Sequence, residues 1–241
     1  MAATASVTLL HPRIRLARSR SGRIRTLPMI SYRDIPNLLT LARGIMAIMF
    51  FVAISLYRYP DEGQAWLYVA TTVFIVAAAT DFLDGYLARR WNVVSAFGRV
   101  MDPFCDKLLV LGALVCLAGP RFLVPEWVED NRLLTMSSGL APWMVVVMFG
   151  RELFVTSIRG VAESSGLSFG AKWSGKAKML FQSVAIPITM ILIATAPPGE
   201  VAWSAWTIQI LMWATVAVTV WSGLPYLATL PSLMKHTSQN A

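Results

Sequence analysis

The sequence predicts an all-α membrane protein with six transmembrane helices. Of its 241 residues, 56% are hydrophobic and only 14% are charged, and the mean hydropathy is +0.59. This apolar share exceeds that of an ordinary soluble domain. Several apolar runs approach or exceed the roughly 18 to 20 residues that span a bilayer. We therefore expect one transmembrane domain at residues 29–235.

Each helix is predicted from an apolar run between two breaks, most of which contain proline or glycine. In chain order, the helices are expected at residues 36–57, 65–89, 98–119, 141–163, 175–196 and 202–230. The breaks between them are Tyr59-Pro60-Asp61-Glu62-Gly63, the turn 91–97, the loop 120–139, the loop 164–174 and Pro197-Pro198-Gly199. The last helix has no clear break before the C-terminal tail, residues 236–241.

The basic residues indicate an orientation in the membrane. Residues 1–28 contain six arginines and no acidic residue, which is typical of a basic tail at anionic lipid headgroups or of an organelle transit peptide. If this leader is cytosolic, the outer loops hold three basic and six acidic residues, and 18 of the 21 Lys and Arg lie at or toward the inner side. The distribution agrees with the positive-inside rule. We expect a cell inner membrane, or an organelle membrane if the leader is a transit peptide.

Three other classes of protein are disfavoured. The net charge of +8 could suggest nucleic acid, but the basic residues lie at the ends of apolar segments and not on a solvated face. Cys105 and Cys116 share one apolar segment, which argues against a disulfide scaffold or a zinc site. His11 and His236 lie in the tails, so a serine or cysteine hydrolase is poorly supported.

Four aspartates lie inside predicted helices, where each ionised carboxylate costs about 2.5 to 3.5 kcal/mol. Asp81 and Asp84 are three residues apart, and Asp102 and Asp106 are four apart, so each pair shares one face of its helix. The short turn between the two helices places both pairs at a similar depth. Four carboxylates repel one another unless some are protonated or a cation is bound. Their hard oxygens favour Mg²⁺ or Mn²⁺, and two ions would suit phosphoryl chemistry.

Small residues accompany the aspartates. Gly85, Ala88 and Gly98 reduce the helix surface to little more than backbone, so a flat polyanionic group could approach closely. Arg89 is placed to pair with a phosphate. Close packing of the two helices is the alternative explanation for the small residues.

The complete pattern resembles the signature of the CDP-alcohol phosphotransferase family. It reads D-x-x-D-G-x-x-A-R, then eight residues, then G-x-x-x-D-x-x-x-D, and it runs from Asp81 to Asp106. The resemblance implies six transmembrane helices around a polar cavity open to the cytosol, a dinuclear metal site and a homodimer. It also implies that Gly85, Ala88, Arg89 and Gly98 bind the CDP-lipid. We expect Asn37 and Thr40 to contact the cytidine or its phosphates, with helix capping as the competing interpretation.

Other segments resemble one branch of that family, the phosphatidylglycerophosphate synthases, whose acceptor is glycerol 3-phosphate. The matching segments are Ile35–Arg43, Asp84–Asn92, Asp102-Pro103-x-x-Asp106-Lys107, Arg151-Glu152 with Arg159, Gly175-Lys176-x-Lys178 and, more weakly, Trp221-Ser222-x-x-x-Tyr226. An acceptor with its own phosphate needs cations, whereas choline, ethanolamine or uncharged inositol would not. The expected acceptor-phosphate residues are Arg151, Arg159, Lys176, Lys178 and, by resemblance, Tyr226. Alternatively, Arg151 pairs with Glu152 or an aspartate, and the lysines are membrane anchors.

The predicted reaction is phosphatidyl transfer from CDP-diacylglycerol to glycerol 3-phosphate. Asp81, Asp84 and Asp102 would bind metal, and Asp106 would be both ligand and general base. Three alternatives remain: a sister transferase that uses inositol phosphate, a cardiolipin-forming relative that uses phosphatidylglycerol, and a cation transporter. The apolar outer helix halves, such as Leu108–Leu117 and Ile186–Ile193, disfavour a transporter.

Overall fold

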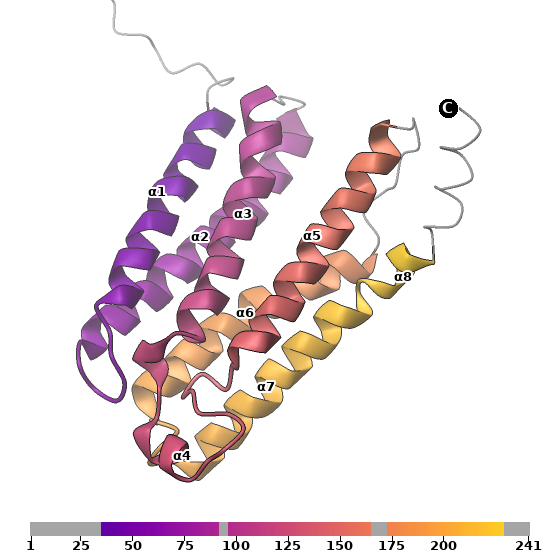
Figure 1. Cartoon of the computed structure of the whole chain (residues 1–241). Helices are drawn as coiled ribbons and strands as arrows, with labels where there is room; N and C mark the ends of the chain where they lie inside the picture. Colours follow the sequence, from indigo (N-terminus) through magenta and orange to yellow (C-terminus); the bar gives the residue numbers. More distant parts are fainter. Residues whose placement is uncertain (1–34, 92–95, 165–172, 229–241) are drawn as a thin grey trace, which may run out of the picture.

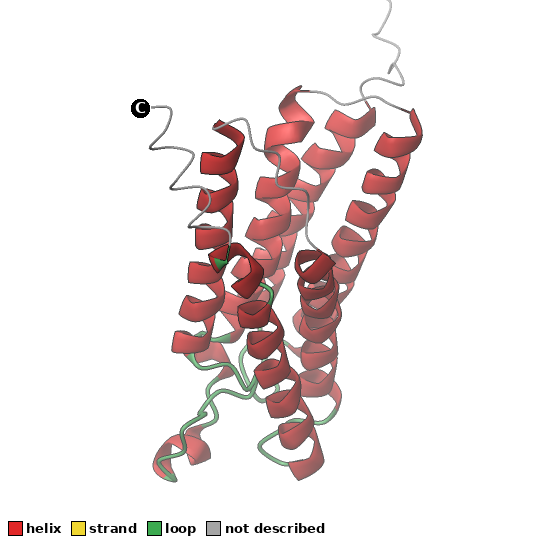
Figure 2. Cartoon of the chain, turned by 90° about the vertical axis from the view of Figure 1, so that its right-hand side faces the viewer, coloured by secondary structure: helices red, strands yellow, loops and turns green. Residues whose placement is uncertain are grey.

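The computed structural model describes residues 35–91, 96–164 and 173–228, which form a bundle of helices with no β-strand among them (Figures 1 and 2). The predicted leader and C-terminal tail lie outside these residues. The long helices are α1 (Ile35–Ser55), α2 (Gln64–Trp91), α3 (Ala96–Leu117), α5 (Pro142–Ser164), α6 (Trp173–Thr195) and α7 (Ala202–Trp221). The short ones are η1 (Pro120–Phe122), α4 (Pro125–Glu129) and α8 (Leu224–Leu227).

The first five long helices begin and end within two residues of their expected bounds, but the prediction of one continuous helix over 202–230 is wrong. Helix α7 ends at Trp221, and α8 begins at Leu224 after a two-residue turn. Pro225 has no backbone N–H to continue the helical hydrogen bonds, and its ring hinders the preceding turn. The amide of Tyr226 therefore bonds to Gly223, so the carbonyl of Ser222 remains available for another donor.

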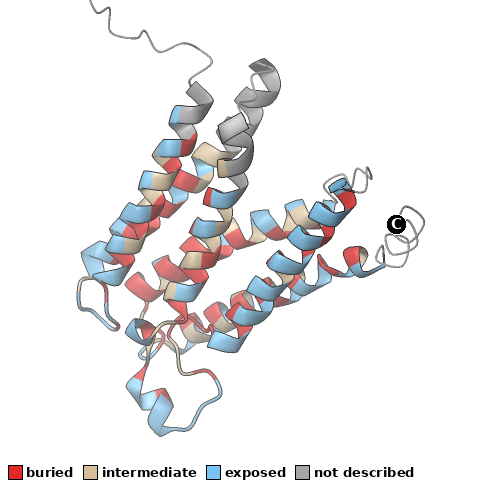
Figure 3. Ribbon diagram, turned by 45° about the horizontal axis from the view of Figure 1, so that its top comes forward, coloured by how far each residue is buried: buried red, intermediate tan, exposed pale blue. Residues whose placement is uncertain are grey.

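The long helices pack against one another around an apolar core. Helices α1, α2 and α3 pack together, α5 packs on α7, and α6 contacts both α2 and α7. The core includes fully buried side chains from five helices: Phe50, Phe74, Leu114, Met144 and Met190. Figure 3 shows buried positions along the inner faces of the helices and exposed positions outside. Burial of these side chains provides the main favourable term in folding.

Large apolar side chains also cover the outer surface. On α1, Leu41, Ile45, Ile48 and Val52 are all more than half exposed. A continuous apolar surface of this kind suits contact with lipid tails and would be unfavourable in water. The outward-facing side chains therefore favour a membrane location.

Two helical segments of the described chain are long and apolar enough to cross a membrane, at Trp173–Thr195 and Ala202–Leu227. A third apolar helix, Thr40–Ser55, is shorter. In α5, Arg151, Glu152 and Arg159 lower the apolarity of the helix. The expectation of six membrane crossings is thus supported at two helices and remains a prediction at the others.

Candidate active site

Three helices converge on one buried arginine. Arg43 of α1 is 1% exposed, and its Nη1 atom lies 3.1 Å from Asp81 Oδ1 of α2 and 2.9 Å from Asp106 Oδ1 of α3. The two aspartates are about a quarter exposed. A single cationic nitrogen thus holds both carboxylates close together and offsets their mutual repulsion.

The other predicted metal and CDP-lipid residues fall mostly outside the described side chains. These are Asn37, Asp84, Gly85, Ala88, Arg89, Gly98 and Asp102, of which the structure describes only the helical backbone. Thr40 is described and is buried on α1, three residues before Arg43. Among the side chains that the structure describes, no three His, Cys, Asp or Glu gather in one place. The convergence of four carboxylates therefore remains a prediction.

A pocket of about 270 Å³ opens next to this pair of aspartates. It lies between α3, α5, α6 and α8, and Asp106 is part of its wall. All five residues predicted to bind the acceptor phosphate also line it: Arg151, Arg159, Lys176, Lys178 and Tyr226. The structure thus gathers in one cavity residues that are up to 120 positions apart in the sequence.

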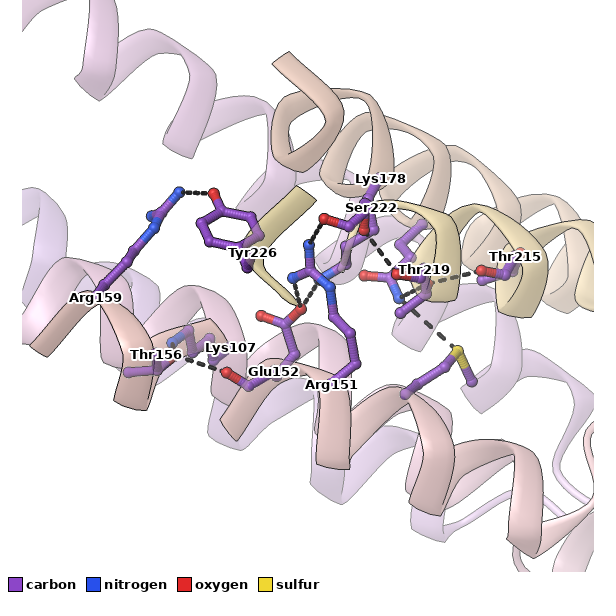
Figure 4. A network of polar contacts seen from close by, with 12 residues as sticks. Lys107, Arg151, Glu152, Thr156, Arg159, Lys178, Thr215, Thr219, Ser222 and Tyr226 are labelled. Carbon is purple, nitrogen blue, oxygen red and sulfur yellow. Dashed lines mark hydrogen bonds and ion pairs between the residues drawn. The ribbon is translucent and has the colours of Figure 1, made fainter. Parts of the chain in front are cut away.

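Glu152 lies between two of the cations in this pocket (Figure 4). Its Oε1 accepts hydrogen bonds from Arg151 Nη1 at 2.6 Å and from Lys178 Nζ at 2.5 Å, and the residue is 8% exposed. The pairing of Arg151 with Glu152, one of the two interpretations of Arg151, is therefore present. Two largely buried cations beside one carboxylate leave a net positive charge that an anionic ligand could balance.

The second arginine of α5 is held by an aromatic residue. Arg159 donates a hydrogen bond from Nη2 to Tyr226 Oη at 2.6 Å, and its Cζ lies 5.4 Å from the centroid of the Tyr226 ring. A guanidinium group at this distance is attracted by the ring face. Tyr226 is fully buried, so this contact with Arg159 is shielded from solvent on the side of the tyrosine.

The lining of the pocket is electropositive. Five of the lining residues are Lys or Arg, and two are Asp or Glu. The Nε atoms of Arg151 and Arg159 are buried and have no hydrogen-bond partner among the described residues. Lys107, at the pocket edge, donates to Thr156 Oγ1 at 2.5 Å. Clefts with an excess of one charge concentrate ligands of the opposite charge, so the pocket suits an anion.

Three polar residues of this region have contacts that the sequence analysis did not predict. Arg43 is the one charged residue of α1, and an intramembrane arginine signals that a partner is needed, although it does not identify that partner. Glu152 was considered only as a partner of Arg151, and its bond to Lys178 adds a second role. Gln182 of α6, which lines the pocket, donates a hydrogen bond to Thr219 Oγ1 of α7 at 3.1 Å and so links the two helices.

Comparisons with known proteins agree on one family. Residues 33–221 match the family model of CDP-alcohol phosphatidyltransferases. A CDP-diacylglycerol--glycerol-3-phosphate 3-phosphatidyltransferase of Bacillus subtilis is 34% identical over 202 residues, covering 80% of this chain and 93% of that protein. One of Pseudomonas fluorescens is 34% identical over 199 residues, covering 80% and 88%. A probable phosphatidylglycerophosphate synthase of Mycobacterium tuberculosis is 31% identical over 195 residues, covering 81% and 80%.

Proposed function

The chain belongs to the CDP-alcohol phosphatidyltransferase family, and on that premise we propose that it transfers the phosphatidyl group of CDP-diacylglycerol to glycerol 3-phosphate. The products are phosphatidylglycerophosphate and CMP. The relatives of Bacillus subtilis and Pseudomonas fluorescens carry both substrates in their names. The observation that best supports the proposal is the position of Asp106, which contacts Arg43 beside Asp81 and also lines the cationic pocket.

The acceptor pocket suits a small phosphate ester. Glycerol 3-phosphate carries a phosphate of up to two negative charges, and Arg151, Arg159, Lys176 and Lys178 provide its counter-charge. The volume of about 270 Å³ is near the lower end of ligand pockets. A soluble three-carbon acceptor therefore fits better than phosphatidylglycerol, the acceptor of a cardiolipin synthase. Inositol phosphate has the same phosphate group and remains the alternative acceptor.

Asp106 is the proposed general base. With the phosphate of the acceptor held by the cations, the C1 hydroxyl faces Asp106, which takes its proton as the oxygen attacks the lipid-side phosphorus. The phosphorus–oxygen bond to CMP breaks, and CMP leaves. Fixing the acceptor at its phosphate end is what aligns the hydroxyl with the carboxylate.

The four aspartates are the proposed ligands of divalent metal, with two ions of Mg²⁺ or Mn²⁺. Asp81 and Asp106 fit such a role because their oxygens already converge on a cationic group. When bound, the metal would offset the charge of the pyrophosphate and of the leaving CMP. The proposed contacts to the CDP-lipid are Asn37, Thr40, Gly85, Ala88, Arg89 and Gly98.

The proposal includes a membrane setting. Six helices span the bilayer of a cell inner membrane, or of an organelle membrane if residues 1–28 are a transit peptide, and the pocket opens to the cytosolic side. The exposed apolar side chains of α1 support the contact with lipid. The chain acts as a homodimer and binds no nucleic acid.

Incorporation of radiolabelled glycerol 3-phosphate into lipid tests the function directly. With purified protein and CDP-diacylglycerol, we expect labelled phosphatidylglycerophosphate and stoichiometric CMP. A chelator should abolish both, and Mg²⁺ or Mn²⁺ should restore them. Inositol phosphate and phosphatidylglycerol serve as competing acceptors, and liposomes test for ion flux. Incorporation that survives removal of metal, or preference for another acceptor, would overturn the proposal.

Arg43 provides a test of the metal site that does not depend on activity. In Arg43→Met, the carboxylates of Asp81 and Asp106 lose their shared cation, so they repel each other when no metal is bound. We expect a lower melting temperature in chelator and a larger increase on addition of Mn²⁺ than in the wild type. Arg132→Met, which removes the exposed ion pair with Asp130, is the matched control. Equal Mn²⁺-induced shifts in wild type and Arg43→Met would contradict this role.

A further inference from the structure

The turn between α7 and α8 reaches back to the acceptor pocket. Pro225 interrupts the helix, and the carbonyl of Ser222 points to α5, where it accepts a hydrogen bond from Arg151 Nη2 at 3.0 Å. Ser222 is the C-cap residue of α7. Carbonyl groups at a helix C-terminus carry partial negative charge and attract cations, so this end of α7 suits a guanidinium group.

Gly223 leaves room for this approach. A β-carbon at this position would lie 3.2 Å from Arg151 Cγ and 3.2 Å from the Val220 carbonyl oxygen. Its backbone φ of −86° is accessible to any residue, so the requirement here is for space. The side chain of Arg151 therefore passes directly over the turn, between Ser222 on one side and Glu152 on the other.

The same turn also orients the other arginine. Two residues into α8, Tyr226 accepts the hydrogen bond from Arg159 Nη2 and lies under its guanidinium group. Arg151 and Arg159 are eight residues apart on α5, about two turns, and both line the pocket. One short turn at the end of α7 thus contacts the two arginines of the acceptor site through a backbone carbonyl and a phenol.

We propose that the α7–α8 turn, residues 222–226, is a positioning element of the acceptor site that sets the affinity for the acceptor's phosphate. The inference rests on the proposed function of the pocket. An arginine side chain loses rotamer entropy when a ligand immobilises it. Holding both guanidinium groups in place before the acceptor arrives reduces that cost. Each group uses only part of its five donors on the turn and Glu152, so donors remain for phosphate oxygens.

The test is the conservative substitution Tyr226→Phe, which keeps the ring beneath Arg159 and removes the hydroxyl. We expect the KM for glycerol 3-phosphate to rise about tenfold, consistent with loss of a hydrogen bond to a charged group. The kcat and the KM for CDP-diacylglycerol should change less than twofold. Gly223→Ala, whose β-carbon would crowd Arg151 Cγ at 3.2 Å, should raise the same KM.

Tyr57→Phe is the matched control. Tyr57 is equally buried, and its hydroxyl donates a hydrogen bond to the carbonyl of Pro60, but it lies outside the pocket. This variant should lose stability without a change in KM. The thermal shift caused by glycerol 3-phosphate without CDP-diacylglycerol gives a second readout, which should shrink in Tyr226→Phe and not in Tyr57→Phe.

The outcomes separate this inference from the proposed function. If Arg159→Gln raises the KM for glycerol 3-phosphate but Tyr226→Phe and Gly223→Ala do not, the turn has no positioning role and the pocket keeps its assignment. If Arg159→Gln itself leaves that KM unchanged, the assignment of the pocket to the acceptor fails. Equal losses of kcat for all substrates in Tyr226→Phe would indicate a structural role only and would overturn the inference.

Discussion

Replacing Asp106 with asparagine is expected to lower kcat by about 10²- to 10⁴-fold, the range that general base catalysis contributes. Asparagine has nearly the same shape, and its amide oxygen can still accept the hydrogen bond from Arg43 that the carboxylate accepts now. The amide cannot take up the proton of the acceptor hydroxyl. Turnover should therefore fall without loss of the fold. The measurement is CMP release at saturating concentrations of both substrates.

Because Asp106 is also a proposed metal ligand, the experiment must separate the two roles. Binding of Mn²⁺, followed by electron paramagnetic resonance, reports ligation without turnover. Asp81→Asn, at the other carboxylate on Arg43, should weaken Mn²⁺ binding and should recover part of its activity at high Mn²⁺. Asp106→Asn should stay inactive at Mn²⁺ concentrations that saturate its site. Near wild-type turnover in folded, metal-loaded Asp106→Asn would rule out the base assignment.

Much of the fold was predictable because apolar runs and their breaks determine helix positions. The first five long helices follow directly from them. The break at Gly223 and Pro225 was not predicted because the hydrophobic pattern continues across it. Helix α4 was not predicted because its five residues are too few to show a helical pattern. The family predicted from the aspartate pattern is confirmed by the match over residues 33–221.

The candidate site was predictable in its residue types and less so in its contacts. Basic residues in apolar helices are costly, and this is why Arg151 and Arg159 stood out in the sequence. Which partner each one has depends on the packing of helices that are distant in the sequence. The bridge from Arg43 to two other helices and the bond from Lys178 to Glu152 are contacts of this kind. The positions of the Asp84 and Asp102 side chains remain predictions.

Arg159→Gln is expected to raise the KM for glycerol 3-phosphate by about 10- to 100-fold, because a hydrogen bond between charged groups contributes about 1.5 to 3 kcal/mol. The glutamine keeps much of the apolar stem and removes the charge. Arg159→Lys should recover only part of the affinity, since a lysine lacks the planar fork and stacks less well on Tyr226.

Arg132→Gln, at an exposed arginine that also lies over an aromatic ring, is the matched control and should leave the KM unchanged. Glycerol, which lacks the phosphate, provides the decisive comparison. If Arg159 binds the phosphate, the preference for glycerol 3-phosphate over glycerol should fall by the same factor as the affinity, because the residual reaction with glycerol does not use this contact. An equal loss of both reactions in Arg159→Gln would place the arginine in the fold of the pocket and not in recognition of the acceptor.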